Sequence, residues 1–371
     1  MLDTFNPTSR VLMGPGPSNV SPRVLGALAK PTIGHLDPQF IQLMDEIKTL
    51  LQYAFATKNE FTIALSAPGS AGMEACIVNL IEPGDKIVVC INGVFGGRLK
   101  ENIERVGAQA IVIEDNWGDP VSVEKVGSAF SSNSNIKALA FVHAETSTGV
   151  CSDAKALCEV AKNYGALTIV DAVTSLGGSE LKVDEWGIDA VYSGSQKCLS
   201  CVPGLSPVSF SQTAVEVIKT RKSKVQSWFL DQSLVMGYWS GDGKRSYHHT
   251  APINSLYALH EALLMLKGEG LRNAWSRHKR LHQRLKSGIE ELGIDFLVDE
   301  PHRLPQLNSL VIPQGIDDVK TRKYLLDTYN LEIGAGLGKL AGTTWRVGLM
   351  GATANEQNIA LLLSALKDVI R

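Results

Sequence analysis

The chain has 371 residues, with 36 Lys and Arg against 38 Asp and Glu, for a net charge of −2. A domain averages about 150 residues, so this length predicts a large domain and a smaller one. No excess of positive charge indicates nucleic acid or an anionic membrane as a partner. The apolar runs fall short of the ~20 residues that span a bilayer. The N-terminus lacks the apolar core of a secretory signal, so we expect a cytoplasmic protein.

Glycine and proline dominate the segment at residues 14–19, and they predict that residues 1–20 form an extended arm without regular structure. Apolar residues three and four apart then predict a helix over residues 38–55. After it the pattern alternates between short apolar runs and helical periods. The predicted strands are 61–65, 86–91, 110–113, 138–142, 167–170, 190–193 and 207–210. The intervening predicted helices are 72–81, 96–106, 121–130 and 154–164.

This alternation predicts an α/β fold with a mostly parallel, seven-stranded sheet covered on both faces. Beyond about residue 257 the pattern changes to long helices, at 255–266 and 271–292, and then to a smaller α+β segment. Strands are expected there near 309–312 and 345–347. We therefore predict an arm at 1–20, a large domain at 21–260 and a small domain at 261–371.

Ligands of parallel sheets bind where the strands end and helices begin. Gly69, Ser70 and Ala71 lie at such a helix start, where small residues leave backbone N–H groups open to an anion. A plain strand-to-helix turn explains them equally well. The segment is neither a dinucleotide-binding loop nor a Walker A loop.

Three more strand ends carry candidate residues. Phe95 lies in a glycine-flanked segment and is either a stacking platform for a flat ring or a core residue. Asp171 ends an apolar strand, where burying a charged carboxylate costs free energy unless a positive group pairs with it. A helix N-cap or a solvated strand end is the structural alternative. Lys197 follows another buried strand, where burial favours the neutral amine that attacks a carbonyl. A surface lysine is the ordinary alternative.

Together these residues predict one ligand. Pyridoxal 5′-phosphate needs an anion cradle, a ring platform, a carboxylate for its ring nitrogen and an amine for its aldehyde. Each feature is weak alone, whereas the set is specific.

Seven segments in the same order and spacing resemble class V aminotransferases, most of all the alanine–glyoxylate and serine–pyruvate aminotransferases. They are residues 14–19, 66–75, 143–150, 168–178, 193–197, 247–250 and 345–351. The resemblance covers nearly the whole chain. It implies fold type I of the pyridoxal-phosphate-dependent transferases, with residues 21–260 as the coenzyme-binding domain.

The resemblance also implies roles for individual residues. Lys197 would hold the coenzyme covalently and then move a proton between the substrate Cα and the coenzyme. Asp171 would pair with the ring nitrogen, and Thr146 would contact the ring hydroxyl. Val173 and Phe95 would cover the two faces of the ring.

Further residues are implied to bind the phosphate and the substrate. Gly69, Ser70, Ala71 and Gln196 would hold the phosphate from one subunit, and Tyr247 and Thr250 would reach the phosphate of the neighbouring subunit. The resemblance therefore implies a homodimer. Arg346 would clamp the substrate carboxylate, since a guanidinium donates two parallel hydrogen bonds. The backbone near Gly16 would close over the substrate side chain.

Two pairs of residues resemble metal-ligand patterns, but we expect both pairs to be structural. His248 and His249 are adjacent, and on an extended segment their side chains are expected to point to opposite sides. Cys198 and Cys201 form a C-x-x-C pair, but zinc would need a second close pair, which Cys151 and Cys158 do not supply. We expect reduced thiols and no metal.

The fold alone does not decide the reaction. A desulfurase of this architecture has a histidine before the lysine and a reactive cysteine in the small domain. Here Gln196 precedes the lysine and no cysteine follows Cys201. A regulator of this family would carry a winged-helix DNA-binding domain ahead of the arm, and none is expected. The sequence therefore predicts a ping-pong aminotransferase for alanine, or serine, with glyoxylate or pyruvate as acceptor.

Overall fold

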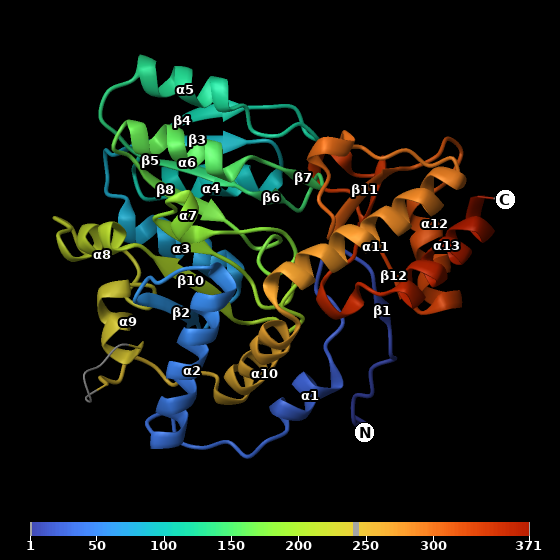
Figure 1. Cartoon of the computed structure of the whole chain (residues 1–371), viewed down its shortest axis with the longest axis horizontal. Coiled ribbons are helices and arrows are strands. Elements are labelled where there is room, and N and C mark those ends of the chain that lie inside the picture. The colour runs from blue at the N-terminus through green and yellow to red at the C-terminus, as the bar shows by residue number, and fades with distance from the viewer. Residues whose placement is uncertain (1, 240–244, 371) are drawn as a thin grey trace.

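The computed structural model describes residues 2–239 and 245–370, and a seven-stranded sheet forms the centre of its larger body (Figure 1). β10 runs antiparallel to its neighbours β2 and β9, and the other pairs are parallel. The predicted mostly parallel sheet is thus confirmed. In order across the sheet, the strands are β2 (Phe61–Leu65), β10 (Ser206–Phe210), β9 (Ala190–Tyr192), β8 (Leu167–Asp171), β5 (Ile136–Val142), β3 (Lys86–Ile91) and β4 (Gln109–Glu114).

Burial explains why the sequence predicts these strands. Every residue of β2, β8, β9 and β10 is buried, so each strand is a nearly continuous apolar run. β4 lies at the edge of the sheet and alternates between exposed and partly buried residues. Its ends at Gln109 and Glu114 extend one residue beyond the predicted strand on each side.

Helices connect and cover these strands. α2 begins after Asp37, whose side chain accepts a hydrogen bond from Gln39 N at 2.8 Å, and it ends at the left-handed Ala56. The helices up to the end of this body are α1 (Pro22–Leu28), α2 (Pro38–Phe55), α3 (Gly69–Leu80), α4 (Val94–Arg105), α5 (Val123–Ser132), α6 (Ala154–Asn163), α7 (Val183–Trp186), α8 (Gln212–Lys219), α9 (Gln232–Trp239) and α10 (Ile253–Glu269).

The C-terminal part forms a second body, which α11 (Leu271–Glu291) enters from the first (Figure 1). Its antiparallel sheet has the order β11-β14-β13. The remaining elements are β6 (Ala144–Glu145), β7 (Val150–Cys151), β11 (Leu307–Val311), α12 (Asp318–Tyr329), β12 (Leu331–Glu332), β13 (Gly334–Ala335), β14 (Thr344–Gly348), α13 (Glu356–Ile370) and 3-10 turns at Glu300–His302, Gly338–Leu340 and Gly351–Thr353.

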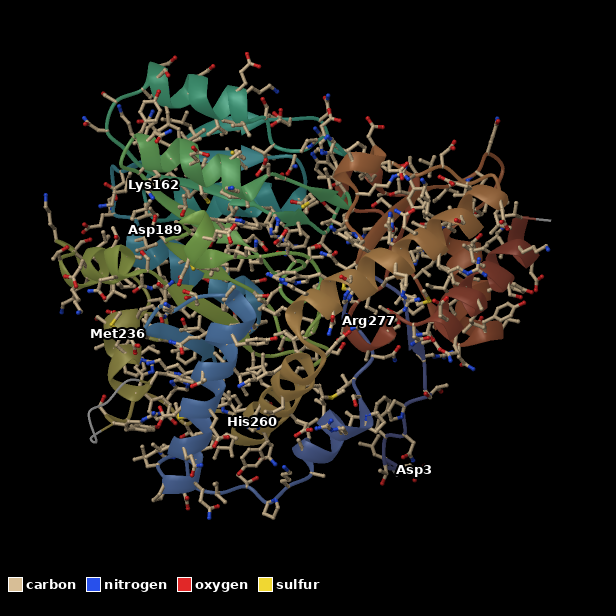
Figure 2. All side chains as sticks on the ribbon, viewed as in Figure 1. Asp3, Lys162, Asp189, Met236, His260 and Arg277 are labelled. Atoms are coloured by element: carbon tan, nitrogen blue, oxygen red, sulfur yellow. The ribbon has the colours of Figure 1, made fainter. Side chains whose placement is uncertain are left out.

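Apolar side chains bury in two large clusters. The first runs from Val24 to Ala274, and the second contains Met13 and residues from Leu281 onward. Arg277 lies on α11 between the two, where the bodies meet (Figure 2). The domain limits given above stay a prediction.

The arm corrects one expectation. Residues 1–20 were predicted to lack regular structure, but β1 (Val11–Leu12) pairs in parallel with β12. Met13 next to it is fully buried in the second cluster. The glycine and proline content of the segment hid a short apolar run that fits a free strand edge. The arm therefore begins its path across the molecule attached to the small body.

Within residues 2–239 and 245–370, no helix is long and apolar enough to cross a membrane. All six cysteines are free thiols, as predicted.

Candidate active site

The loops after β5, β8 and β9 meet at one edge of the large sheet. Val142 pairs with Asp171 and Asp171 pairs with Tyr192, so these parallel strands end in register. Lys197 lies in the loop after β9. The sheet therefore brings the predicted carboxylate and the predicted amine to the same edge.

Asp171 is buried, with 3% of its surface exposed. Val173 N donates to its Oδ1 at 2.8 Å, and the hydroxyl of Tyr192 donates to its Oδ2 at 2.8 Å. Burial raises the pKa of this carboxyl to about 7, although both hydrogen bonds act in the opposite direction. The helix-cap alternative is wrong, because the residues after Asp171 form turns.

Lys197 lies under the N-terminal arm. Its Nζ donates a hydrogen bond to Pro15 O, and a Cβ placed on Gly16 would lie only 2.7 Å from Nζ. Burial, together with the positive charge of Arg346, lowers the pKa of the amine to about 8. The side chain is therefore not an ordinary surface lysine, and its neutral form is accessible near neutral pH.

Serine 18 fixes the arm on the lysine loop. Ser18 N donates to Gln196 O at 2.9 Å, and its Oγ donates to Lys197 O at 2.8 Å. Gly16 adopts φ +101°, a conformation that favours glycine, and it has no room for a side chain against Lys197. The arm and the lysine loop are thus held together by hydrogen bonds to backbone carbonyls on both segments.

Arg346 projects from β14 and is 7% exposed. Its Nε donates to Ala335 O at 2.7 Å and its Nη1 to Thr146 O at 3.3 Å. Burial lowers the pKa of the guanidinium to about 10. Among the described residues no carboxylate lies within ion-pair distance of it, so this buried cation lacks an anion.

The start of α3 is the segment predicted to form an anion cradle. Its N-cap is Pro68, which supplies no side-chain acceptor for the first N–H groups. Gly69 is buried, and a Cβ there would lie 3.3 Å from Ser193 O and from Val173 Cγ2. Ser70 is exposed and Ala71 is half-buried.

The predicted ring and phosphate contacts lie on the loops around this edge. Phe95 is half-buried in the first turn of α4, with the Arg98 guanidinium 4.8 Å from its ring centre. Thr146 hydrogen-bonds Thr174 through its hydroxyl. Gln196 has a buried side-chain oxygen without a hydrogen-bond partner in the described part of the chain. The roles of these residues remain predictions.

Tyr247 and Thr250 are both exposed, with 62% of the tyrosine surface accessible. The expectation for the histidines between them is wrong. His248 Nδ1 lies 2.8 Å from His249 Nδ1, so the two rings meet instead of pointing apart. The segment is irregular and not a strand, so the alternation of side chains does not apply. His249 Nε2 also bonds Ser66 Oγ at 2.7 Å.

In the described ranges no group of three or more His, Cys, Asp or Glu side chains is arranged to hold a metal ion.

Two buried residues of the site, Tyr192 and Glu145, were not predicted from the sequence. Tyr192 donates to Asp171 but reads only as an apolar strand residue, because its role depends on the register of two strands. Glu145 is fully buried and accepts hydrogen bonds from the first turn of α4. The one sequence feature that could have identified Glu145 is its position directly before Thr146, in the segment 143–150 that carries the family resemblance.

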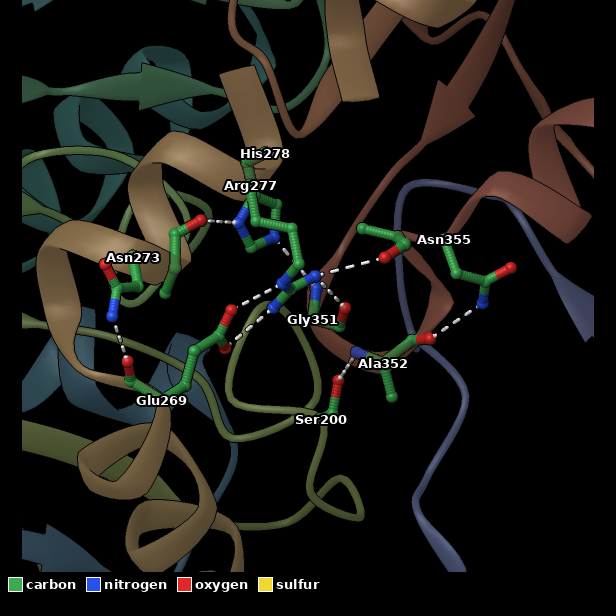
Figure 3. A network of polar contacts seen from close by, with 10 residues as sticks. Ser200, Glu269, Asn273, Arg277, His278, Gly351, Ala352 and Asn355 are labelled. Carbon is green, nitrogen blue, oxygen red and sulfur yellow. Dashed lines mark hydrogen bonds and ion pairs between the residues drawn. The ribbon is translucent and has the colours of Figure 1, made fainter. Parts of the chain in front are cut away.

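A polar network holds the strand of Arg346 against the lysine loop (Figure 3). Arg277 binds both carboxylate oxygens of Glu269, at 2.5 and 2.9 Å, and donates to Gly351 O at 2.9 Å. Gly351 N donates to His278 Nε2 at 3.1 Å, and Ala352 N donates to Ser200 Oγ at 2.7 Å. The turn after β14 is therefore bonded to α11 and to the loop that carries Lys197.

The unpaired guanidinium gives a prediction that needs no coenzyme. We expect acetate or propionate to raise the thermal unfolding temperature of the protein, because the carboxylate supplies the missing anion at Arg346. At a hundredfold excess over the dissociation constant the stabilisation is about 2.7 kcal/mol. Differential scanning fluorimetry measures it, with Arg346→Met as the control. An equal rise in the variant would show that the anion binds elsewhere.

The chain is similar to known proteins over nearly its full length. The family model described as Aminotransferase class-V matches residues 16–355. An alanine–glyoxylate aminotransferase of Drosophila melanogaster is 40% identical over 366 residues, which cover 98% of this chain and 93% of the relative.

Two solved structures have the same fold. An alanine–glyoxylate aminotransferase from Nostoc sp. superimposes with a TM-score of 0.97 at 44% identity, covering 100% of this chain and 98% of that one. A ureidoglycine–glyoxylate aminotransferase from Bacillus subtilis gives 0.97 at 36% identity, covering 99% and 94%. With these matches and with the buried amine, carboxylate and guanidinium at one sheet edge, the chain belongs to the class V aminotransferase family.

Proposed function

We propose that this aminotransferase uses pyridoxal 5′-phosphate to move an amino group from alanine to glyoxylate in a ping-pong reaction. One observation carries the proposal. Asp171 and Arg346 are buried and Lys197 is half-buried around one edge of the sheet, and no ion pair within the described residues joins or neutralises them. Such a set needs a ligand that carries the complementary charges.

The residues present fit the coenzyme. The α3 start offers N–H groups without a side-chain acceptor, which suits a phosphate. Asp171 is oriented by two donors, which suits a protonated ring nitrogen. The amine of Lys197 suits the aldehyde, since its pKa is lowered to about 8. When bound, the coenzyme supplies an electron sink for a carbanion at the substrate Cα.

The chain supplies the remaining steps. Gly69, Ser70, Ala71 and Gln196 would hold the phosphate, and Thr146 would contact the ring hydroxyl. These assignments rest on their positions at the sheet edge and on the family resemblance.

Lys197 would take the proton from the substrate Cα as a general base and would then deliver it to the coenzyme. Arg346 would hold the substrate carboxylate with two parallel hydrogen bonds. Pro15 and Gly16 lie over the lysine amine, so the arm would exclude water from the reacting carbon.

The relatives support small substrates. Proteins named alanine–glyoxylate aminotransferase match at 40% and 44% identity over nearly the whole chain. Serine as donor, or pyruvate as acceptor, is the alternative. A cysteine desulfurase structure matches with a TM-score of 0.78 at 15% identity, which shows the fold alone.

We further propose that the active form is a homodimer. Tyr247 and Thr250 are exposed in the single chain and would reach the phosphate of a neighbouring subunit. Trp228, Phe229 and Leu234 are also exposed, with 63%, 39% and 40% of their surfaces accessible. Large exposed apolar side chains in one part of a surface favour a covered interface.

Substrate choice is tested by half-reactions. Purified protein loaded with the coenzyme is mixed with alanine, serine, glutamate or ureidoglycine, and the absorption of the coenzyme is followed. We expect fast conversion with alanine and at least about tenfold slower conversion with glutamate, a difference of about 1.4 kcal/mol. Lys197→Ala should abolish conversion. Comparable rates for glutamate and alanine would contradict the small-substrate assignment.

A second test concerns Asp171. The hydroxyl of Tyr192 stabilises the ionised carboxylate, so Tyr192→Phe should raise the pKa of Asp171 above its value of about 7. Coenzyme binding needs the ionised form and weakens as the pH falls through that pKa. In the variant the weakening should begin about one pH unit higher. Fluorescence titrations of the apoprotein from about pH 5.5 to about pH 9, on both sides of that pKa, measure the shift. Identical profiles for the native protein and Tyr192→Phe would refute it.

A further inference from the structure

Glu145 is a fully buried carboxylate to which the family resemblance gave no role. It ends the short strand β6, after β5 and directly before Thr146. Oε1 accepts hydrogen bonds from Ser147 N at 3.0 Å and from Ser147 Oγ at 2.6 Å. Oε2 accepts from Phe95 N at 3.2 Å and from Gly96 N at 3.3 Å. All four partners are donors, so each carboxylate oxygen is used twice.

The two donors on Oε2 belong to the first turn of α4. The first N–H groups of a helix have no acceptor within the helix, and an N-cap side chain normally supplies one. The N-cap of α4 is Gly93, which has no side chain. Val94 N donates instead to Ser147 Oγ at 2.9 Å. Glu145 and Ser147 thus accept from three consecutive N–H groups of a helix that lies elsewhere in the sequence.

The position at Gly93 explains why the cap comes from another loop. A Cβ on Gly93 would lie 2.4 Å from Glu145 Cδ and 2.5 Å from Ser147 Oγ. A serine or aspartate at residue 93 therefore has no room. The carboxylate of Glu145 occupies the place that a local cap would take.

The charge of Glu145 suits this place. The ionised carboxylate is the form that accepts all four hydrogen bonds, and the positive end of α4 favours that form. Arg346 contributes a favourable long-range attraction. No ion pair forms between the two, so the guanidinium keeps donors for a substrate. Burial opposes ionisation and raises the pKa of Glu145, which the four hydrogen bonds counter.

We propose that Glu145 is a positioning residue for the coenzyme ring: it caps α4 from across the sheet edge and thereby holds Phe95 in place. The inference rests on the proposed function, since Phe95 is useful there only as a ring platform. Phe95 is in the first turn of α4, the part of a helix that frays when its cap is lost. The backbone N–H of Phe95 is itself one of the groups that Glu145 binds.

The test measures binding of pyridoxal 5′-phosphate to the apoprotein, by fluorescence titration and by the circular dichroism of the bound coenzyme. In Glu145→Gln the amide NH₂ must face a donor, so at least one buried N–H loses its acceptor. We expect about tenfold or greater loss of coenzyme affinity and a weaker dichroic band. Ser147→Ala is a milder variant that should act in the same direction, and it decides the question should Glu145→Gln not fold.

A double-mutant cycle with Phe95→Leu separates positioning from general stability. If Glu145 acts through Phe95, the double variant should lose no more affinity than the weaker-binding single variant. Asp317→Ala is the matched control, because Asp317 caps α12 in the C-terminal body by accepting from Lys320 N at 2.8 Å. The control should lower the unfolding temperature and leave coenzyme affinity unchanged.

Two outcomes would overturn the inference: losses that multiply in the double variant, or unchanged dichroism and affinity in both Glu145→Gln and Ser147→Ala. Failure of the native protein to bind the coenzyme would instead reject the proposed function together with this role.

Discussion

The site depends on charged groups that are withdrawn from water without an ion-pair partner. Asp171, Arg346 and Glu145 are buried and Lys197 is half-buried around one sheet edge, yet no ion pair joins any of them to another described residue. Pairing would have lowered the cost of burying these groups, and the fold instead keeps them apart. Burial accordingly raises the pKa of Asp171 to about 7 and lowers that of Lys197 to about 8. A ligand that is cationic at one end and anionic at others completes the arrangement.

Three separate segments hold these groups in place. The strand ends supply Asp171 and the lysine loop, the arm lies over the lysine through Ser18, and β14 carries Arg346 from the small body. The turn at Gly351–Thr353 links two of them, since it binds both α11 and Ser200 of the lysine loop. A change in the position of the small body therefore moves the substrate clamp relative to the amine, which is a route by which closure over a substrate can set the geometry of the reaction.

The sequence predicted what depends on local pattern. Buried strands are continuous apolar runs, so the seven strands of the sheet were found to within about two residues, and the polar residues at their ends identified Asp171 and Lys197. It did not predict contacts between distant segments. Tyr192 acts on Asp171 only because two strands share a register, and Glu145 caps a helix some fifty residues away. The periodicity of apolar residues likewise does not predict the contact between His248 and His249 or the pairing of β1 with β12, because both depend on the path of irregular backbone segments.

The central claim is that the amine at residue 197 binds the coenzyme covalently. Treatment of the coenzyme-loaded protein with borohydride makes such a bond permanent, and peptide mass spectrometry then locates it. The account predicts a single phosphopyridoxyl group, on Lys197, and none in Lys197→Ala. A label on another lysine, or no label in protein that binds the coenzyme, would contradict it.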